Sequence, residues 1–257
     1  MTRESSARKA GTRKMISSLC VVPGVVRVSD SYLIQFETPG PALTVFGDDG
    51  STPEICLLRS PSGTGKTTFL RSLHSSLRGI QLPAPALSFR LRPDPPAPGY
   101  AAVGFVPQDP PRLAHWPVSR LLPSDAECAK LFFEPDELVG LGAKRLGQFS
   151  GGQRKRIYTS SVLEHLRRTP AGIAFLLLDE TLDGLGSEHA VDCLQRVCSC
   201  WQELSQTPLR VVLVTHLDDG PSSVFSTLQP APRRLGLTLL DDISGRLRVF
   251  LEERHAG

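Results

Sequence analysis

The 257-residue sequence predicts an α/β fold built on a mostly parallel sheet. Two continuous apolar runs, Ile173–Leu178 and Val211–Val214, are bounded by breakers, as expected of strands that are covered on both faces. Between them, Ser187–Leu204 carries apolar residues at helical spacing, and Lys66–Leu77 shows the same pattern directly after a glycine-rich stretch. These elements predict a sheet with helices packed against it.

Composition is that of an ordinary globular protein, with 40% hydrophobic and 21% charged residues. No apolar stretch approaches the roughly 20 residues of a membrane-spanning helix. Any role at a membrane would therefore require docking on another subunit. The net charge of +3 comes from the first 14 residues. The nearly neutral remainder argues against broad nucleic-acid binding, and no nucleic-acid partner is expected.

We expect residues 1–19 to form a flexible basic leader and residues 20–257 to form a single domain. The leader fits a disordered tail, which we favour, and also an organelle transit peptide. The six cysteines contain no CxxC pair, so reduced thiols in an intracellular protein are expected. The spacing of Cys193, Cys198 and Cys200 suits no standard zinc site.

The N-terminal part has the composition of strands. Val21–Val28, Tyr32–Phe36 and Ile55–Arg59 are predicted as strands, and so is Ala102–Val106. The proline-rich stretch 83–98 is predicted as a surface insertion in this β-rich region.

The middle of the chain has a different pattern. Residues 116–168 hold helix-like segments at Ser124–Phe133, Asp136–Leu141 and Gln153–Leu166. The part from Pro221 to the end carries no functional motif.

A phosphate-binding loop is predicted between the strand Ile55–Arg59 and the helix Lys66–Leu77. Glycines there let backbone N–H groups face phosphates, and the helix N-terminus adds a positive dipole. Lys66 should reach the β- and γ-phosphates, and the Thr67 hydroxyl should ligate Mg²⁺. The predicted nucleotide-binding residues of this loop are Ser60, Pro61, Ser62, Gly63, Thr64, Gly65, Lys66, Thr67 and Thr68.

Two acids follow the apolar run Ile173–Leu178, in the manner of a Walker B strand. Ligands in open α/β sheets bind at the carboxyl ends of the strands. Asp179 is expected to hold Mg²⁺ and Glu180 to polarise the attacking water. Together with the loop, they predict a P-loop NTPase core.

A third motif indicates which family of P-loop NTPases the sequence resembles. Phe149-Ser-Gly-Gly-Gln153 opens a predicted helix and resembles the LSGGQ signature of ATP-binding-cassette (ABC) ATPases. In that family the signature contacts the γ-phosphate held by the other subunit. The resemblance therefore implies that Ser150, Gly151, Gly152 and Gln153 complete a partner's site.

Gln108 and His216 each close a predicted strand, in the places of the family's Q-loop and switch histidine. The resemblance implies that Gln108 senses Mg²⁺ and the γ-phosphate, which makes it a catalytic and metal-site candidate. It implies that His216 bonds the γ-phosphate. All five motifs run in the family's order over residues 21–218.

The resemblance implies three subdomains and their cofactors. We expect a P-loop core with a mostly parallel sheet, an N-terminal antiparallel β-subdomain, and a small inserted helical subdomain at 116–168. ATP and Mg²⁺ are the expected cofactors. Tyr32 is the first candidate for stacking on the adenine and Phe36 is the second.

Two positions depart from the family pattern. Ser60 stands where the loop has glycine, and we expect a modest backbone cost there. Gly186 stands where the family's D-loop has the aspartate that helps to couple the two sites of the dimer. Asp183 is nearby but offset.

The resemblance favours an ATP-hydrolysing subunit of an ABC transporter. It would dimerise head to tail, with itself or another ABC domain, and drive a separate transmembrane subunit. Such a subunit would be cytoplasmic or organellar and peripheral to a membrane. The alternatives are a soluble ABC ATPase in a non-transport assembly process and an ATP-gated scaffold without activity. The transported substrate is not encoded in any of these motifs.

Overall fold

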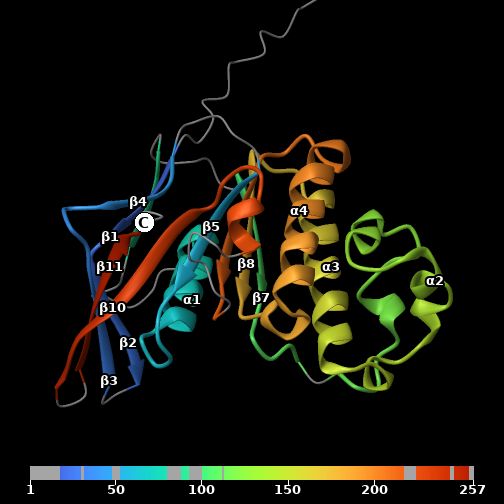
Figure 1. The fold of residues 1–257 in the computed structure, drawn as a ribbon, viewed down its shortest axis with the longest axis horizontal. Coiled ribbons are helices and arrows are strands. Elements are labelled where there is room, and N and C mark those ends of the chain that lie inside the picture. The colour runs from blue at the N-terminus through green and yellow to red at the C-terminus, as the bar shows by residue number, and fades with distance from the viewer. Residues whose placement is uncertain are drawn as a thin grey trace, which may run out of the picture.

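The computed structural model describes residues 18–29, 32–47, 53–79, 88–92, 100–111, 113–216, 224–243 and 246–254 (Figure 1). The expected leader at 1–19 therefore lies almost wholly outside the described residues. The predicted α/β fold is confirmed, with an eight-stranded sheet at its centre. The order of its strands is β2-β3-β11-β10-β5-β9-β8-β7.

The four strands from β5 to β7 in this order alternate in sequence with the main helices, whereas the other four do not. The strand bounds are β2 Gly24–Ser29, β3 Tyr32–Glu37, β5 Glu54–Arg59, β7 Ala101–Val106, β8 Ile173–Asp179, β9 Leu209–Val214, β10 Arg233–Ile243 and β11 Arg246–Glu253. Neighbouring strands are parallel except in the β2–β3 and β10–β11 pairs. The mostly parallel sheet was therefore predicted correctly.

The centre of the sheet is buried on both faces, as its apolar runs predicted. Every residue of β8 and β9 is buried. In β8, Phe175 and Leu177 pack into the core beneath α1 (Lys66–Leu77), whereas Leu176 and Leu178 pack into the core on the opposite face. This period-two alternation places helices on both sides of one sheet.

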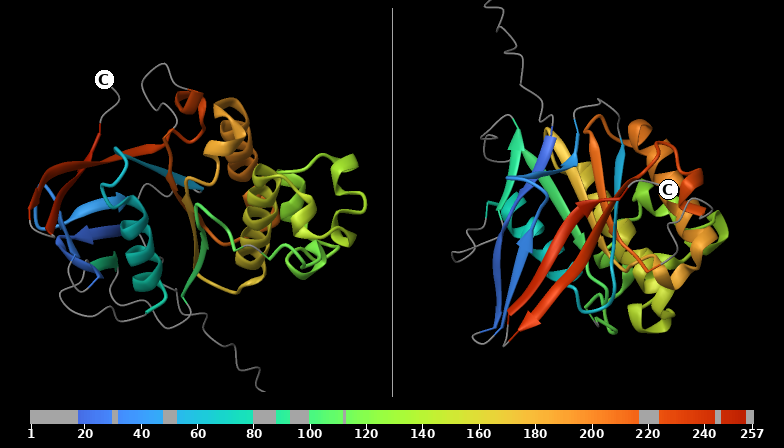
Figure 2. Two further views of the ribbon diagram at one scale, coloured as in Figure 1. Left: turned by 90° about the horizontal axis from the view of Figure 1, so that it is seen from below. Right: turned by 60° about the vertical axis from the view of Figure 1, so that its left-hand side comes forward.

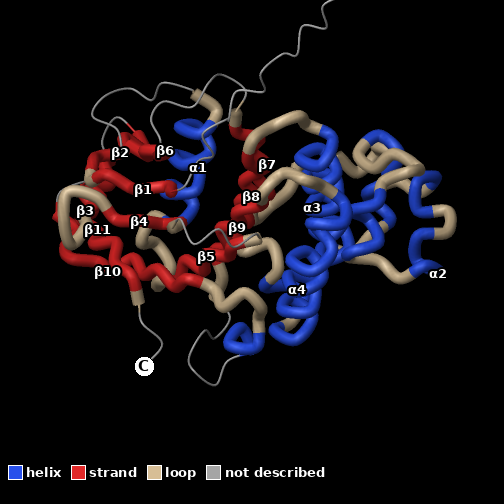
Figure 3. Tube along the Cα trace, turned by 90° about the horizontal axis from the view of Figure 1, so that it is seen from above, coloured by secondary structure: helices blue, strands red, loops and turns tan. Residues whose placement is uncertain are grey.

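Two long helices cover the second face. They are α3 (Gly151–Arg168) and α4 (Ser187–Leu204), which lie on the side of the sheet opposite α1 (Figures 1 and 3). Their apolar stripes pack onto that face, with Trp201 of α4 fully buried.

A second, three-stranded antiparallel sheet includes two of the N-terminal strands, which are drawn in blue in Figure 2. Its order is β4 (Leu43–Phe46), β1 (Ser18–Val22) and β6 (Ser88–Arg92). Its inner residues join the core beneath α1. The expected antiparallel β-subdomain is thus present.

Two strand predictions need correction. Val21–Val28 is not one strand, because Pro23 separates β1 from β2 and the two enter different sheets. Proline has no N–H to donate to a ladder, so a strand readily ends there. The proline-rich stretch is more than an insertion, since β6 within it pairs with β1 along its length.

The segment from residue 113 to α3 holds little regular helix. Ser124–Phe133 was predicted to be helical and contains only a 3₁₀ turn at Glu127–Leu131. Asp136–Leu141 yields the single-turn α2 (Pro135–Leu138) and a further 3₁₀ turn that begins at Leu141. Pro135 starts α2 and Gly140 ends this run with φ of 71°, so proline and glycine limit the helix length here.

The C-terminal part, which carries no motif, forms the β10–β11 hairpin between β3 and β5. The alternating burial of β11 shows the period-two pattern that the sequence contains there. Within the described residues, no helix has the length and apolar character needed to cross a bilayer.

Candidate nucleotide-binding site

The predicted phosphate-binding loop connects β5 to α1 and turns on two glycines with positive φ. Gly63 has φ of 81° and Gly65 has φ of 88°. A Cβ on Gly65 would lie 3.0 Å from Cδ1 of Ile34, so both conformation and space require glycine there. The loop therefore has the local geometry that its sequence predicts.

The N-terminus of α1 fits an anion. Its N-cap is Gly65, no side chain accepts a hydrogen bond from its first amides, and its first turn has no acidic residue. Those N–H groups and the helix dipole are thus available to phosphate oxygens.

Lys66 begins α1 and lies inside the loop. Its Nζ donates to the carbonyl oxygens of Ser60 at 2.9 Å and Pro61 at 3.0 Å. Burial lowers the pKa of Lys66, while the carboxylates of Glu180 and Asp179 act in the opposite direction. The ammonium therefore has weak neutral acceptors that phosphate oxygens can replace.

The departure at Ser60 is accommodated by new hydrogen bonds. The Ser60 hydroxyl contacts the Thr64 hydroxyl and lies 3.3 Å from the Pro61 carbonyl. Thr64 also donates to that carbonyl at 2.8 Å. The Ser60 side chain is therefore accommodated inside the loop.

The side chains of Thr67, in the first turn of α1, and Asp179, at the end of β8, meet through their oxygen atoms. Thr67 Oγ1 donates to Asp179 Oδ1 at 3.2 Å, which joins the loop to the end of β8. Asp179 is buried, and burial raises the pKa of its carboxyl group. A hydroxyl and a carboxylate are ligands that suit Mg²⁺ bound mainly through phosphates, so these residues fit the expected ion.

Glu180 is the point where the predicted catalytic residues meet. Its Oε2 accepts from Gln108 Nε2 at 2.6 Å, and its Oε1 lies 2.7 Å from His216 Nε2. The structure thus brings Gln108, Glu180 and His216 together from three strand ends. Gln108 contacts Glu180 and not the Thr67–Asp179 pair.

Glu180 has an unusual backbone, with φ of 50°. Non-glycine residues rarely adopt this conformation, and it concentrates at functional sites. Its N–H donates to the Val214 carbonyl at 3.0 Å, and its carbonyl accepts from Lys155 Nζ at 3.1 Å. Lys155 is therefore a site residue that the sequence did not indicate.

The signature residues cap α3. The Ser150 hydroxyl accepts from the Gln153 N–H at 3.2 Å, and the Gln153 side chain accepts from the Ser150 N–H at 3.0 Å. This is a capping box, which leaves the N–H groups of Gly151 and Gly152 without intrahelical partners. A Cβ on Gly151 would meet nothing within 4 Å, so packing inside this chain does not require that glycine.

Tyr32 opens β3 at the edge of the sheet where the phosphate loop lies. Strand β3 is parallel to β11, β11 is antiparallel to β10, and β10 is parallel to β5. The start of β3 is therefore at the edge where β5 ends, and Ile34 already contacts Gly65. Tyr32 is half-buried and remains a candidate for the adenine contact.

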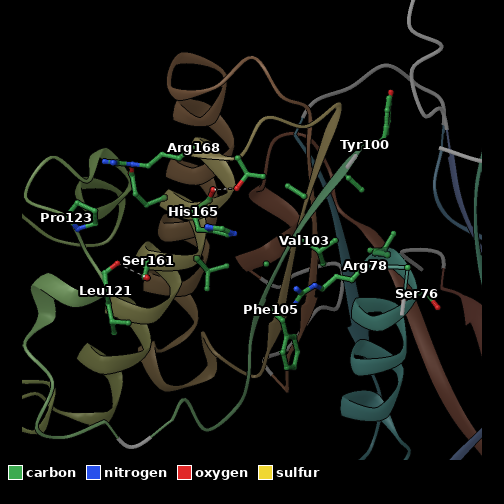
Figure 4. Close-up of a pocket in the computed structure, with 18 residues that line it drawn as sticks. Ser76, Arg78, Tyr100, Val103, Phe105, Leu121, Pro123, Ser161, His165 and Arg168 are labelled. Atoms are coloured by element: carbon green, nitrogen blue, oxygen red, sulfur yellow. Dashed lines mark hydrogen bonds and ion pairs between the residues drawn. The ribbon is translucent and has the colours of Figure 1, made fainter. Parts of the chain in front are cut away.

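A separate cavity of about 1080 Å³ lies beside β7, between the C-terminal parts of α1 and α3 (Figure 4). Its lining includes Ser76, Arg78, Tyr100, Val103, His165 and Arg168. None of the predicted site residues lines it. Because α1 starts at the phosphate loop and ends here, this cavity is remote from the motifs.

Known proteins share both sequence and fold with the chain. The sulfate/thiosulfate import ATP-binding protein CysA of Caulobacter vibrioides is 32% identical over 162 residues, which are 56% of this chain and 45% of that protein. The chain thus spans less than half of that relative. No protein-family model matches the chain.

Solved structures extend the likeness to the whole fold. An ATP-binding cassette of an ABC transporter, MJ1267, superposes with a TM-score of 0.55 at 16% identity and covers 90% of each chain. A metal-chelate type ABC transporter superposes with a TM-score of 0.52 at 16% identity, covering 94% of this chain and 98% of its own. The chain therefore has the fold of ABC nucleotide-binding domains.

Two further structural relatives carry different names. One is an RNase-L inhibitor, with a TM-score of 0.53, 18% identity and coverage of 93% of this chain and 40% of its own. The other is an archaeal ribosome recycling factor in complex with a ribosomal stalk protein. It has a TM-score of 0.57 and 17% identity, and the match covers 97% of this chain and 42% of that chain. At these identities the likeness shows the ABC fold alone.

The loop before α4 has a glycine-specific conformation at the predicted departure from the family pattern. Gly186 has φ of 78° and ψ of 156° and precedes α4. An aspartate would be strained in that backbone. Three residues earlier, Asp183 contacts the switch segment, a connection that the sequence left open.

Proposed function

We propose that this ABC domain binds Mg-ATP at Ser60–Thr68 and hydrolyses it. The observation that carries the proposal is the convergence on Glu180. Gln108 and His216 hold its carboxylate at 2.6 Å and 2.7 Å, one residue after Asp179 and its partner Thr67. These side chains lie at one edge of the sheet, which supports roles as a base, its orienting partners and a pair of metal ligands.

Each residue has a distinct task in this proposal. The first amides of α1 and the Lys66 ammonium bind the phosphates, after Lys66 leaves the Ser60 and Pro61 carbonyls. Thr67 and Asp179 hold Mg²⁺, which supplies charge neutralisation when bound. Glu180 orients the attacking water and accepts its proton.

The site would be completed by a second ABC domain, arranged head to tail. Two features of this chain support that arrangement. Ser150 and Gly151 are exposed at the start of α3, and the amides of Gly151 and Gly152 have no intrahelical acceptor. Such a helix start suits the γ-phosphate of a nucleotide bound by the facing subunit.

The role we propose for the ATPase cycle is to drive a separate transmembrane subunit. The curated relative is named as an import ATP-binding protein, and two of the structural relatives belong to ABC transporters. Isolation of the native complex in mild detergent tests this role. Co-purification of a polytopic membrane protein supports it, whereas a set of partners without membrane spans would instead support the non-transport assembly role.

Nucleotide binding itself is tested by Lys66→Ala. Loss of charge-assisted hydrogen bonds to phosphate is worth about 1.5–3 kcal/mol, so ATP affinity should fall at least roughly tenfold in calorimetric titration. Lys130→Ala is the matched control, because Lys130 is exposed and paired only with Glu127. Tight ATP binding by the Lys66 variant would refute the proposed role of the loop.

A further inference from the structure

The loop after Glu180 is fastened to both neighbouring motif segments. The buried Thr181 hydroxyl donates to the Val106 carbonyl at 3.2 Å, at the end of β7 and two residues before Gln108. The Asp183 carboxylate accepts from the Thr215 hydroxyl at 2.6 Å and from the His216 backbone N–H at 2.8 Å. The loop thus joins the Q-loop strand to the switch segment within one chain.

We propose that Asp183 is a positioning residue for the switch histidine, acting within its own chain. The inference rests on the proposed function and deepens it. Asp183 fixes the backbone of residue 216, and the His216 imidazole then lies 2.7 Å from Glu180. A chain of contacts therefore runs from Asp183 through His216 to Glu180.

Asp183 holds the switch segment at the point where the chain leaves the sheet. Strand β9 ends at Val214, so residues 215 and 216 lie beyond the sheet ladder. The His216 side chain is 42% exposed, which means that packing does not fix the ring. Bonds to a carboxylate are about twice as strong as neutral ones, so Asp183 is suited to hold this backbone.

The same contacts distinguish Asp183 from the missing D-loop aspartate. One of its carboxylate oxygens bonds Thr215 and the other bonds His216. Both oxygens are therefore engaged inside the chain, and Gly186 has no carboxylate to offer across a dimer. Asp183 thus holds residues 215 and 216 of its own chain. Coupling between the two sites of a dimer would involve other residues.

The test uses steady-state hydrolysis by the full chain carrying Asp183→Ala. Loss of the carboxylate should lower kcat by about tenfold or more and change KM for ATP by less than about twofold, because the phosphate loop is intact. Asp183→Asn should recover part of the loss. Its carbonyl can accept from the His216 N–H, and its amide can donate to the Thr215 hydroxyl. Asp125→Ala is the matched control, an aspartate 73% exposed on its side chain and paired with Arg168.

A mutant cycle with His216→Ala separates positioning from general stability. If Asp183 acts through His216, Asp183→Ala should cause no further loss of kcat in the His216→Ala background. Independent, additive losses would overturn the proposal. So would an Asp183→Ala variant that matches Asp125→Ala.

Amide hydrogen exchange separates this proposal from the proposed function. The His216 amide should exchange about tenfold faster in Asp183→Ala than in the wild type, with the Asp125→Ala control unchanged. If the wild type does not hydrolyse ATP, the proposed function fails, but this exchange rate still decides whether Asp183 holds the switch. Equal exchange in the two proteins would contradict the inference.

Discussion

Among the described residues, Glu180 is the only non-glycine residue with a positive φ. Its backbone and side chain contact three segments, through Lys155, through Gln108, and through Val214 and His216 at the end of β9. Strain of about 1–3 kcal/mol persists only where surrounding structure enforces it. The conformation of Glu180 is therefore a property of the assembled site and not of its local sequence.

Gly186 gives a prediction about backbone conformation. Gly186→Ala should lower the free energy of unfolding by about 1–3 kcal/mol, because φ of 78° with ψ of 156° is accessible essentially to glycine alone. No atom lies within 4 Å of an added Cβ, so the cost comes from the backbone. Urea unfolding measures it.

The control for this prediction is Gly40→Ala. Gly40 also has open space around an added Cβ, and its φ is not positive. Equal unfolding free energies for the two variants would contradict the strain at Gly186. The same strain means that restoring the family's aspartate at position 186 would carry a backbone cost.

The placement of the phosphate loop, Asp179 and Glu180 could be predicted from the sequence, because each stands next to a strand or helix that the local sequence predicts. Lys155 and Asp183 could not. Each acts on a residue distant along the chain, Lys155 on the carbonyl of Glu180 and Asp183 on residue 216. Their roles depend on how α3 and β9 pack, which no spacing in the sequence reveals.

At the scale of elements, the N-termini of α1 and α3 lie toward the same edge of the sheet. The C-terminal parts of both helices line the remote cavity beside β7, whereas Lys66 and Lys155 near their starts approach the ends of β5 and β8. Both helices therefore present unpaired amides where the strands end. This arrangement brings α3, which carries the predicted signature, into contact with the proposed catalytic residue Glu180 of the same chain.

Lys155→Met tests that link. Removing the ammonium from the Glu180 carbonyl should slow ATP hydrolysis about threefold to tenfold with little change in KM, as expected for one hydrogen bond of 0.5–1.5 kcal/mol. Steady-state kinetics measures this split, and Lys155→Arg should restore part of the rate. Turnover equal to that of Lys130→Met, an exposed lysine, would show that the contact has no role.

Elements with strong periodicity were predicted within one or two residues, such as α1, α4 and β8. Elements whose extent depends on pairing with another strand were not predicted correctly. Proline ended β1 although the apolar pattern continued, and β6 formed because β1 offered a free edge. The 3₁₀ turns before α3 arise where proline and glycine interrupt an apolar pattern that still packs into the core.

At the scale of the whole molecule, the proposed site has two halves, and the residues proposed for both lie in one chain. The loop, Asp179 and Glu180 lie at the carboxyl edge of the sheet, and the exposed Ser150 begins α3. In the proposed head-to-tail pair, each chain supplies the first half to its own nucleotide and the second half to its partner's. Hydrolysis should then depend on dimer formation as well as on Glu180.

Glu180→Gln tests this account most directly, because glutamine keeps the size of the side chain and removes its basicity. Turnover should fall at least about 100-fold, the usual contribution of a general base, while ATP binding persists. Analytical ultracentrifugation with Mg-ATP should show the variant accumulating as a dimer that the wild type populates only transiently. Hydrolysis at the wild-type rate, or a variant that stays monomeric with ATP bound, would contradict it.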